Sequence, residues 1–327
     1  MRLIELQHIT MTYQSGGRLH QSEVRAVRDV TLHIEQGECL ALVGESGSGK
    51  STLGRIAVGL EKPTEGRVLF KGHILDARKV DRQDRQALQM VYQNSFEAAN
   101  PRFTASQVVE EPIRYFRLAP KNEWNQRILE LLGRVGIPKD EAEKKTTEFS
   151  GGQLQRICIA RALAARPELI LLDEPLSSLD VSVQAQILNL LRHLKEEFGL
   201  TYLLISHDLE TVYNIADRLA VMYAGRIVEE IDDIELFDSL RHPYTALLLG
   251  KDTDVEQKPA AEDKAVAGES DAAADDETGE IDATADDRTE GCVYANRCPY
   301  AEKRCFELVP ELTEFEQGHR IACHHCR

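Results

Sequence analysis

The sequence has no apolar run of the roughly 20 residues that a membrane-spanning helix needs. Its longest apolar stretches, LILLDEP and TYLLIS, have the length of a strand. The first residues, MRLIELQHITMTY, carry an acid early and no long apolar core, so we expect no signal peptide. With 42% hydrophobic and 29% charged residues, the composition predicts a globular protein, which we expect to stay in the cytosol.

Outside one segment the chain also lacks a strong charge of either sign. The segment from Lys251 to Gly291 contains 15 Asp or Glu residues and 4 Lys or Arg residues, which accounts for −11 of the net charge of −16. This segment is rich in Ala and Thr and cannot bury enough apolar surface to fold alone, so it predicts an acidic disordered linker over 251–290. A spacer is the simplest role, and a salt-adapted or partner-binding segment is the alternative. The negative charge disfavours nucleic acid as a partner.

The seven cysteines are unevenly placed. Cys39 and Cys158 lie in apolar patterns and are expected to pack in the core. Five others crowd the last 36 residues: Cys292, Cys298, Cys305, Cys323 and Cys326. In a reducing cytosol this clustering favours metal or cluster binding over disulfides.

The hydropathy pattern predicts an α/β fold. Residues 1–36 alternate apolar and polar side chains, as half-buried antiparallel strands do, whereas CLALVGES is a continuous apolar run typical of a buried parallel strand. A mainly helical pattern runs from Thr104 to Ala165, and the strands LILLDEP and TYLLIS follow with the helix VQAQILNLLRHLKEEFG between them. This alternation indicates βαβ units in a mostly parallel sheet.

A phosphate-binding loop is predicted between the run CLALV and a helix that starts at Lys50. GESGSGKS matches the pattern G-x-x-x-x-G-K-[ST], in which glycines let backbone N–H groups wrap phosphates, the lysine reaches the β- and γ-phosphates and the last hydroxyl ligates Mg²⁺. The predicted phosphate-contacting residues are Gly44, Ser46, Gly47, Gly49, Lys50, Ser51 and Thr52.

Two later strands end in chemically useful side chains. LILLDEP delivers Asp173 to the carboxyl edge of the sheet, where it can hold Mg²⁺ through water, and Glu174 follows as a candidate general base for the attacking water. LLIS delivers His207 to the same edge, where a γ-phosphate sensor is a better interpretation than a merely packed histidine.

FSGGQLQR, at 149–156, places small residues at the start of a second predicted helix, which suits an anion. The order of phosphate loop, FSGGQ, LILLDEP, SSLD and SHD resembles the ATP-binding subunit of an ABC transporter, over residues 1 to about 250 and again over 291–327. The resemblance implies a P-loop (RecA-like) core with an N-terminal antiparallel β subdomain, a helical subdomain at about 95–165 and a small Cys-rich C-terminal extension. It also implies that two ATPase domains pair head to tail around each ATP.

The same resemblance supplies further site residues. Ser150, Gly151, Gly152 and Gln153 would serve the partner's γ-phosphate, and Asp180 would cross the dimer to the opposite phosphate loop. Tyr13 resembles the aromatic residue that stacks on adenine, with an ordinary strand-face tyrosine as the alternative. Gln93 looks like the glutamine that links Mg²⁺ and the attacking water to the helical subdomain. The departures, Phe149, Leu176 and Ser178, touch no charged or metal-binding atom, so we expect an active ATPase.

Segments between the motifs resemble the dipeptide/oligopeptide/nickel importer group: NPR at 100–102, DVSVQAQILNLL and HPYTALLL. The tail GCVYANRCPYAEKRCFELVPEL resembles the cysteine-bearing extension of those subunits, in which Cys292, Cys298, Cys305 and Cys323 are the matching positions. Four thiolates could hold an iron–sulfur cluster, such as [4Fe-4S], or zinc, and an extension without metal is the third possibility.

By this resemblance the partners are a second, possibly nonidentical, ABC ATPase subunit, two transmembrane permease subunits and an extracytoplasmic solute-binding protein. The ATPase would lie on the cytoplasmic face of the membrane, and ATP with Mg²⁺ would be bound. The alternatives are the same role for nickel or another solute, a soluble ABC ATPase without a transport role, a P-loop kinase, or a module whose tail thiols sense redox state.

Overall fold

A computed structural model describes residues 1–15, 22–177, 179–250 and 290–326. The segment for which the sequence predicts an acidic disordered linker, 251–290, lies outside the described residues except for its last position.

The N-terminal part is an antiparallel sheet with the strand order β2-β1-β4-β5 among the described residues. Alternation of apolar and polar side chains along the first two strands produces this sheet, because Leu6, Ile9, Val30 and Leu32 turn one face into the core. The strands are β1 (Arg2–Ser15), β2 (Ser22–Glu35), β4 (Glu65–Phe70) and β5 (His73–Ile74). The antiparallel β subdomain expected from residues 1–36 is confirmed.

The second sheet has the order β11-β12-β10-β9-β3-β8-β7-β6 in the described part of the chain. Five neighbouring strands, β9 to β6 in that order, run parallel, and the remaining three add antiparallel at one edge. Their bounds are β3 (Cys39–Val43), β6 (Leu88–Val91), β7 (Leu169–Asp173), β8 (Thr201–Ser206), β9 (Arg218–Tyr223), β10 (Arg226–Ile231), β11 (Thr313–Glu316) and β12 (His319–Ile321). The α/β fold class is confirmed.

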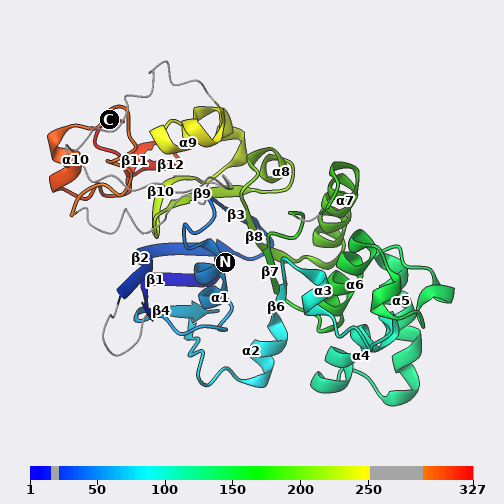
Figure 1. The fold of residues 1–327 in the computed structure, drawn as a ribbon. Helices are drawn as coiled ribbons and strands as arrows, with labels where there is room; N and C mark the ends of the chain where they lie inside the picture. The colour runs from blue at the N-terminus through cyan, green and yellow to red at the C-terminus, as the bar shows by residue number, and fades with distance from the viewer. Residues whose placement is uncertain (16–21, 178, 251–289, 327) are drawn as a thin grey trace, which may run out of the picture.

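The central strands contribute side chains to two separate cores, because successive side chains along a strand point to opposite faces of the sheet. In β3, Ala41 and Val43 join a core shared with the helices of the right-hand side of Figure 1, whereas Leu40 and Leu42 join a core shared with the antiparallel sheet. Residues on both faces are fully buried, which explains the uninterrupted apolar run in the sequence. Cys39 and Cys158 lie in the first core, as predicted, and burial raises the pKa of the Cys39 thiol to about 12.

Helices cover the second sheet, and α3 to α6 form a separate group on the right of Figure 1. The α-helices are α1 (Lys50–Ala57), α2 (Arg82–Ala87), α3 (Ser95–Ala98), α4 (Ala105–Phe116), α5 (Trp124–Arg134), α6 (Gly151–Ala164), α7 (Val181–Phe198), α8 (Leu209–Tyr213), α9 (Pro243–Leu248) and α10 (Lys303–Glu307). Four 3₁₀ turns connect described elements: η1 (Lys121–Glu123), η2 (Lys139–Glu141), η3 (Thr146–Glu148) and η4 (Ile234–Ser239). In the described ranges no helix combines the length and the apolar character that crossing a bilayer requires.

The C-terminal tail, residues 290–326, docks on the edge of the second sheet (Figure 1). Strand β12 pairs antiparallel with β10, with Glu229 opposite Ile321 and Ile231 opposite His319. The Nε2 atom of His319 lies 2.9 Å from Oε1 of Glu229, and both side chains are fully buried. A buried polar contact of this kind fixes how the tail sits on the sheet, because either group alone would be left unsatisfied.

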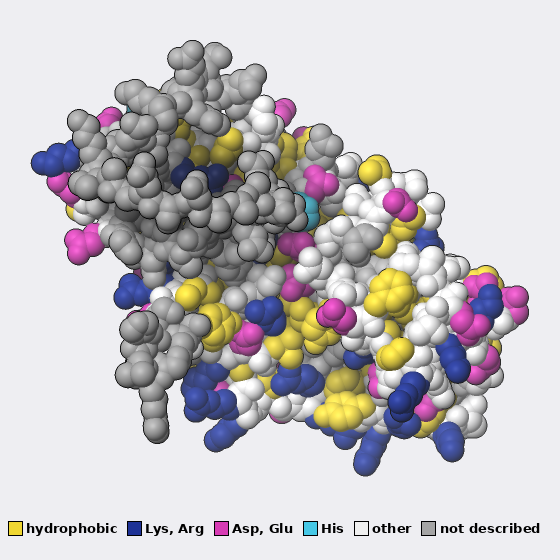
Figure 2. Space-filling model, viewed as in Figure 1, with side chains coloured by type: hydrophobic (Ala, Val, Ile, Leu, Met, Phe, Trp, Pro, Cys, Tyr) yellow, Lys and Arg dark blue, Asp and Glu magenta, His cyan; other side chains and the backbone are white. Residues whose placement is uncertain are grey.

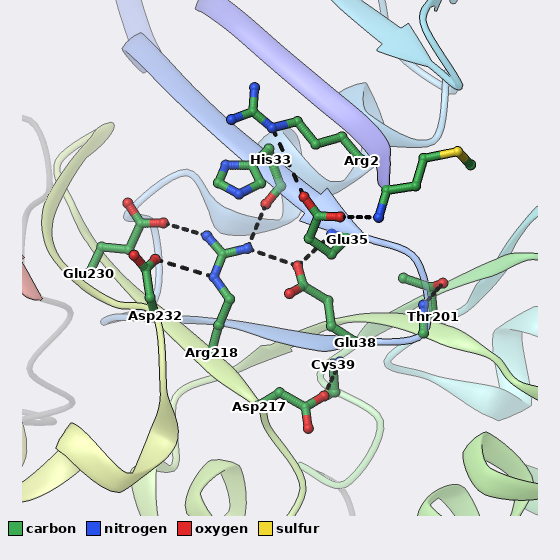
Figure 3. Close-up of polar contacts among 12 residues, drawn as sticks. Arg2, His33, Glu35, Glu38, Cys39, Thr201, Asp217, Arg218, Glu230 and Asp232 are labelled. Carbon is green, nitrogen blue, oxygen red and sulfur yellow. Dashed lines mark hydrogen bonds and ion pairs between the residues drawn. The ribbon is translucent and has the colours of Figure 1, made fainter. Parts of the chain in front are cut away.

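Arg218 ties the two sheets together at their junction (Figure 3). Its guanidinium forms ion pairs with Glu38 and Glu230, each at 2.9 Å, and with Asp232 at 3.4 Å. It also donates to the backbone carbonyl of His33 in β2, at 3.3 Å. A side chain from β9 therefore contacts the antiparallel sheet and the end of β10 at the same time.

Candidate functional site

The predicted phosphate loop joins β3 to α1 and wraps the lysine side chain. The Nζ atom of Lys50 donates to the carbonyl oxygens of Gly44 and Glu45, both at 2.7 Å. Burial lowers the pKa of the Lys50 ammonium, and the nearby carboxylates oppose this effect. The loop thus holds a cation and its backbone amides at the start of α1, an arrangement suited to a polyphosphate.

Two of the loop glycines are required by their surroundings. A Cβ atom at Gly44 would lie 2.1 Å from the carbonyl oxygen of Met222, and one at Gly49 would lie 2.1 Å from that of Ala26. Gly49 also has a φ of 102°, in the region that favours glycine. The loop can therefore lie against β9 and β2 only with glycine at these positions.

The other predicted residues of the loop differ in exposure. Ser46 and Gly47 are exposed, whereas Thr52 is buried at the start of α1.

Ser51 and Asp173 meet at the carboxyl end of β7, as the sequence predicts for a magnesium site. The Ser51 hydroxyl donates to Oδ1 of Asp173 at 2.7 Å. Burial raises the pKa of the Asp173 carboxyl above its usual value, although the Ser51 hydrogen bond opposes the shift. A hydroxyl and a carboxylate are hard oxygen donors, and Mg²⁺ commonly takes one or two carboxylates together with substrate phosphates. These residues fit the ion.

Two further predicted residues, Gln93 and His207, lie around the carboxylate of Glu174. Gln93 donates from Nε2 to Oε2 of Glu174 at 3.0 Å, and Nδ1 of His207 lies 3.5 Å from the same oxygen. Glu174 has a φ of 44°, a conformation that costs energy for a side chain of this size and is concentrated at functional sites. A hollow of about 80 Å³ lies beside it, lined by Glu174, Ser206 and His207 among others. The site can hold water next to a carboxylate.

Tyr13 lies at the end of β1, beside the first turn of α1. Its hydroxyl donates to Oε2 of Glu61 at 2.6 Å and lies 3.5 Å from Oγ1 of Thr52. Its side chain remains partly exposed, at 36%.

The FSGGQ segment starts α6 with a capping box. The Ser150 hydroxyl accepts from the Gln153 amide at 3.3 Å, and the Gln153 side chain accepts from the Ser150 amide at 3.1 Å. A Cβ atom at Gly152 would lie 2.5 Å from Cγ1 of Val183, so α6 and α7 approach closely here. Gly151 leaves the first turn without a side chain, and the helix start can therefore face an anion.

Asp180 precedes α7 and its side chain makes no capping hydrogen bond to that helix. No hydrogen bond between described residues joins Asp180 or Ser150–Gln153 to the phosphate loop. The structure therefore presents two groups of predicted phosphate-binding residues that are not connected within one chain.

The tail cysteines are the candidate ligands for an iron–sulfur cluster or zinc. Burial raises the pKa of the Cys298 thiol to about 11, and nearby Cys323, Cys292 and Cys305 add to this shift, so the four matching positions lie near one another. The pKa of the Cys323 thiol is instead lowered, mainly by the neighbouring Cys326. Yet within the described ranges no three or more His, Cys, Asp or Glu side chains are arranged to hold a metal ion. The iron–sulfur cluster and zinc stay predictions, and we derive no step from either.

Three residues at this site were not predicted. Tyr244 Oη accepts a hydrogen bond from the Glu45 amide at 2.7 Å, and Arg297 of the tail forms an ion pair with the Glu45 carboxylate. An acidic residue within a phosphate loop needs a counter-charge, so Glu45 itself was a signal that a cation should lie nearby. Nothing in the spacing indicated that this cation is 252 residues away.

A phosphate loop between a buried strand and a helix, with two consecutive carboxylates at the end of a parallel strand, defines a P-loop nucleotide-binding protein. Residues 27–177 match the family described as ABC transporter, and residues 228–305 match the one described as oligopeptide/dipeptide transporter, C-terminal region.

The chain is similar along almost its whole length to ATP-binding proteins of transporters. It is 42% identical to the oligopeptide transport ATP-binding protein AppF of Bacillus subtilis, covering 98% of this chain and 97% of that protein. It is also 42% identical to a probable peptide ABC transporter ATP-binding protein, y4tS, of Sinorhizobium fredii, over 92% of this chain and 82% of that one.

A solved structure shares the fold and part of the sequence. The ATP-binding cassette MJ0796, in a dimeric post-hydrolysis state bound to ADP and phosphate, is 32% identical, with a TM-score of 0.62, covering 69% of this chain and 97% of that one. The chain therefore belongs to the ATP-binding subunits of ABC transporters, in the oligopeptide/dipeptide group, and is an ABC-type ATPase.

Proposed function

We propose that this chain powers a membrane importer for di- or oligopeptides by binding and hydrolysing ATP. The observation that carries the proposal is a pair of contacts at adjacent positions, Ser51 with Asp173 and Gln93 with Glu174, in a chain 42% identical to a peptide-transport ATPase.

ATP binding is assigned to the phosphate loop and α1. Lys50 exchanges its two carbonyl contacts for the β- and γ-phosphates, because a charged acceptor makes the stronger hydrogen bond. Ser51 and Asp173, with Gln93, would hold Mg²⁺, which supplies charge neutralisation on the phosphates when bound. Tyr13, at the rim of α1, stacks on the adenine ring.

Hydrolysis is assigned to Glu174 and its neighbours. The Glu174 carboxylate orients a water molecule and accepts its proton as the water oxygen attacks the γ-phosphorus and the bond to the β–γ bridging oxygen breaks. Gln93 positions this carboxylate through the hydrogen bond from its side chain. His207, next to the same oxygen, donates a hydrogen bond to the γ-phosphate.

A second ATPase subunit completes the site. Ser150, Gly151, Gly152 and Gln153 start a 14-residue helix whose first amides can face the γ-phosphate bound by the partner's loop. Asp180, free of a capping role, reaches across the same interface. Among the described residues no hydrogen bond joins these side chains to the phosphate loop of their own chain, which supports this pairing, as does the dimeric form of the related cassette.

Two permease subunits in the membrane, supplied by an extracytoplasmic solute-binding protein, are the remaining partners. A groove of about 350 Å³ lies between β6 and α4, lined by Gln89, Glu111, Tyr115 and Arg161 among others, and Gln93 is the second residue after β6. Lys and Arg side chains gather along the lower rim of the molecule near α2 and α4 (Figure 2). A permease helix in this groove would sense movement of Gln93, and the chain would lie on the cytoplasmic face of the membrane.

The division of labour along the chain follows. We assign residues 1–250 to the ATPase domain, with its helical subdomain at about 95–165, residues 251–290 to a linker and residues 291–327 to a C-terminal extension. An iron–sulfur cluster in the extension stays a prediction, which iron and sulfide analysis of anaerobically purified protein tests.

The experiment that tests the function compares uptake of a labelled dipeptide in cells whose own copy is replaced by wild type or by Glu174→Gln. We expect the variant to assemble with its partners and bind ATP, but to lower ATP hydrolysis at least about 100-fold and to abolish uptake. Glu141→Gln, which removes a half-buried carboxylate paired only with the exposed Lys144 in the described structure, is the matched control and should transport normally.

Unchanged dipeptide uptake in the Glu174→Gln cells would refute peptides as the transported substrate. It would not refute the assignment of ATPase activity. Nickel, longer peptides and sugars would then be the substrates to test. Equal ATP hydrolysis by the variant and the wild type would refute the role of Glu174.

A further inference from the structure

The phosphate loop contains a carboxylate, that of Glu45, where a triphosphate is expected to bind. Its backbone carbonyl is one of the two that accept from Lys50, so this residue borders the space in which the phosphates would lie. Like charges at short distance repel, and an uncompensated carboxylate here would weaken binding of ATP. The Glu45 side chain therefore needs a cation that does not compete for the phosphates.

Arg297 of the tail supplies that cation. Its NH1 lies 2.9 Å from Oε2 of Glu45 and its NH2 lies 3.2 Å from Oε1, a two-point contact. The two side chains are 36% and 32% exposed, so solvent screens the pair, but the fork geometry limits the motion of both. NH1 also donates to the hydroxyl of Tyr223 at 3.4 Å.

Aromatic rings hold the guanidinium in place. Its carbon lies 5.8 Å from the ring centre of Tyr223 and 6.0 Å from that of Tyr294, within the range of cation–π attraction. Tyr244 packs against both rings, with centroids 4.6 and 5.5 Å away, and its hydroxyl accepts from the Glu45 amide. The backbone of Glu45 is thus bound by α9 and its side chain by the tail.

The tail itself is anchored on both sides of Arg297. The Cys292 amide donates to the carbonyl of Cys305 at 2.7 Å, and the Arg297 amide donates to that of Tyr294 at 3.1 Å, which closes the turn that presents the guanidinium. The next attachment is the pairing of β12 with β10. The arginine is therefore held by a folded element and is not a free side chain.

We propose that Arg297 is a positioning residue for ATP binding: the tail neutralises the Glu45 carboxylate and holds the phosphate loop open to the triphosphate. The C-terminal extension is on this account part of the ATP site. The inference rests on the proposed ATPase function and adds a residue from outside the ATPase domain to it.

The test measures the KM for ATP and kcat in the assembled transporter in liposomes, together with nucleotide binding to the purified full chain. Arg297→Ala should raise the KM for ATP about tenfold with a smaller change in kcat, because the exposed carboxylate repels the substrate. The double variant Arg297→Ala/Glu45→Gln should lower the KM again toward the wild-type value, since the repulsion is gone, and Glu45→Gln alone completes the double-mutant cycle. Arg297→Lys keeps the charge and should fall between wild type and Arg297→Ala.

Arg320→Ala is the matched control, because it removes another tail arginine, which forms ion pairs with Asp232 and Glu230. An unchanged KM in Arg297→Ala, with active wild type, would overturn the inference and leave the proposed function standing. So would a double variant as defective as the single one, because that result would mean that Arg297 only stabilises the fold. Wild type without ATPase activity would refute the proposed function itself.

Discussion

Replacing Arg218 by methionine should destabilise the protein strongly, because it leaves buried carboxylates without their cation. Glu230 is 2% exposed and Glu38 is 10% exposed, and each lies 2.9 Å from the guanidinium (Figure 3). Removing one partner of a buried ion pair typically costs about 3–5 kcal/mol. Glu230 keeps Arg320 at 3.1 Å and Glu38 keeps the Glu35 amide at 2.7 Å, so we expect the lower end, about 3 kcal/mol.

The loss should depend on pH in a defined direction. Burial raises the pKa of both Glu38 and Glu230 above the ordinary value of 4.5 in the folded protein, and Arg218 opposes this shift. A carboxyl with a raised pKa holds its proton in the folded chain after the unfolded chain has released it, so its contribution to stability falls as pH rises through that window. Without Arg218 the pKa of both groups rises further, and the gap between Arg218→Met and wild type should narrow from pH 8 to pH 5.

The assay is urea unfolding followed by circular dichroism and by the fluorescence of Trp124, the single tryptophan. Arg320→Met is the control, since this arginine is 31% exposed and pairs with two of the same carboxylates. Exposed ion pairs contribute up to about 1 kcal/mol, so this variant should lose little. A loss below about 1 kcal/mol in Arg218→Met, or a gap that widens toward pH 5, would contradict the reasoning.

Three further outcomes are expected. Lys50→Ala should weaken ATP binding about 30-fold or more, measured with a fluorescent nucleotide, because one charged hydrogen-bond donor is lost; affinity within twofold of wild type would contradict its role. Gly49→Ala should weaken nucleotide binding and lower the melting temperature, since the added Cβ would lie 2.1 Å from the Ala26 carbonyl oxygen, and a normal melting curve would show that the loop can move away. Glu229→Gln should make the tail more sensitive to limited proteolysis, because the fully buried His319 loses a charged partner at 2.9 Å, whereas an unchanged cleavage rate would mean that β12 alone holds the tail.

Local patterns predicted much of this molecule because the residues concerned are close in sequence. The strands β3, β7 and β8 are buried on both faces, which produces continuous apolar runs that can be recognised without a structure. The phosphate loop and Asp173 followed from the same reasoning, since carboxyl ends of parallel strands meet at one edge of a sheet.

Contacts between distant charges could not be predicted in this way. Arg218 lies 180 residues from Glu38, and Arg297 lies 252 residues from Glu45, so no periodicity connects them. Thiol clustering was visible in the sequence, but whether four sulfurs point to one centre depends on how the turns around Cys292, Cys305 and Cys323 are closed. That geometry is set by the docking of the tail, which the composition does not encode.

The pairing of β12 with β10 also has a practical consequence. Without the tail, β10 would present unpaired backbone N–H and C=O groups along one side, and such strands readily pair with other chains. A chain cut after residue 250 would therefore tend to aggregate. Its loss of activity would then report aggregation and not a missing contact with ATP. A fragment designed to carry Lys50 and Glu174 in a monomeric protein must therefore also include β12, the strand that covers β10.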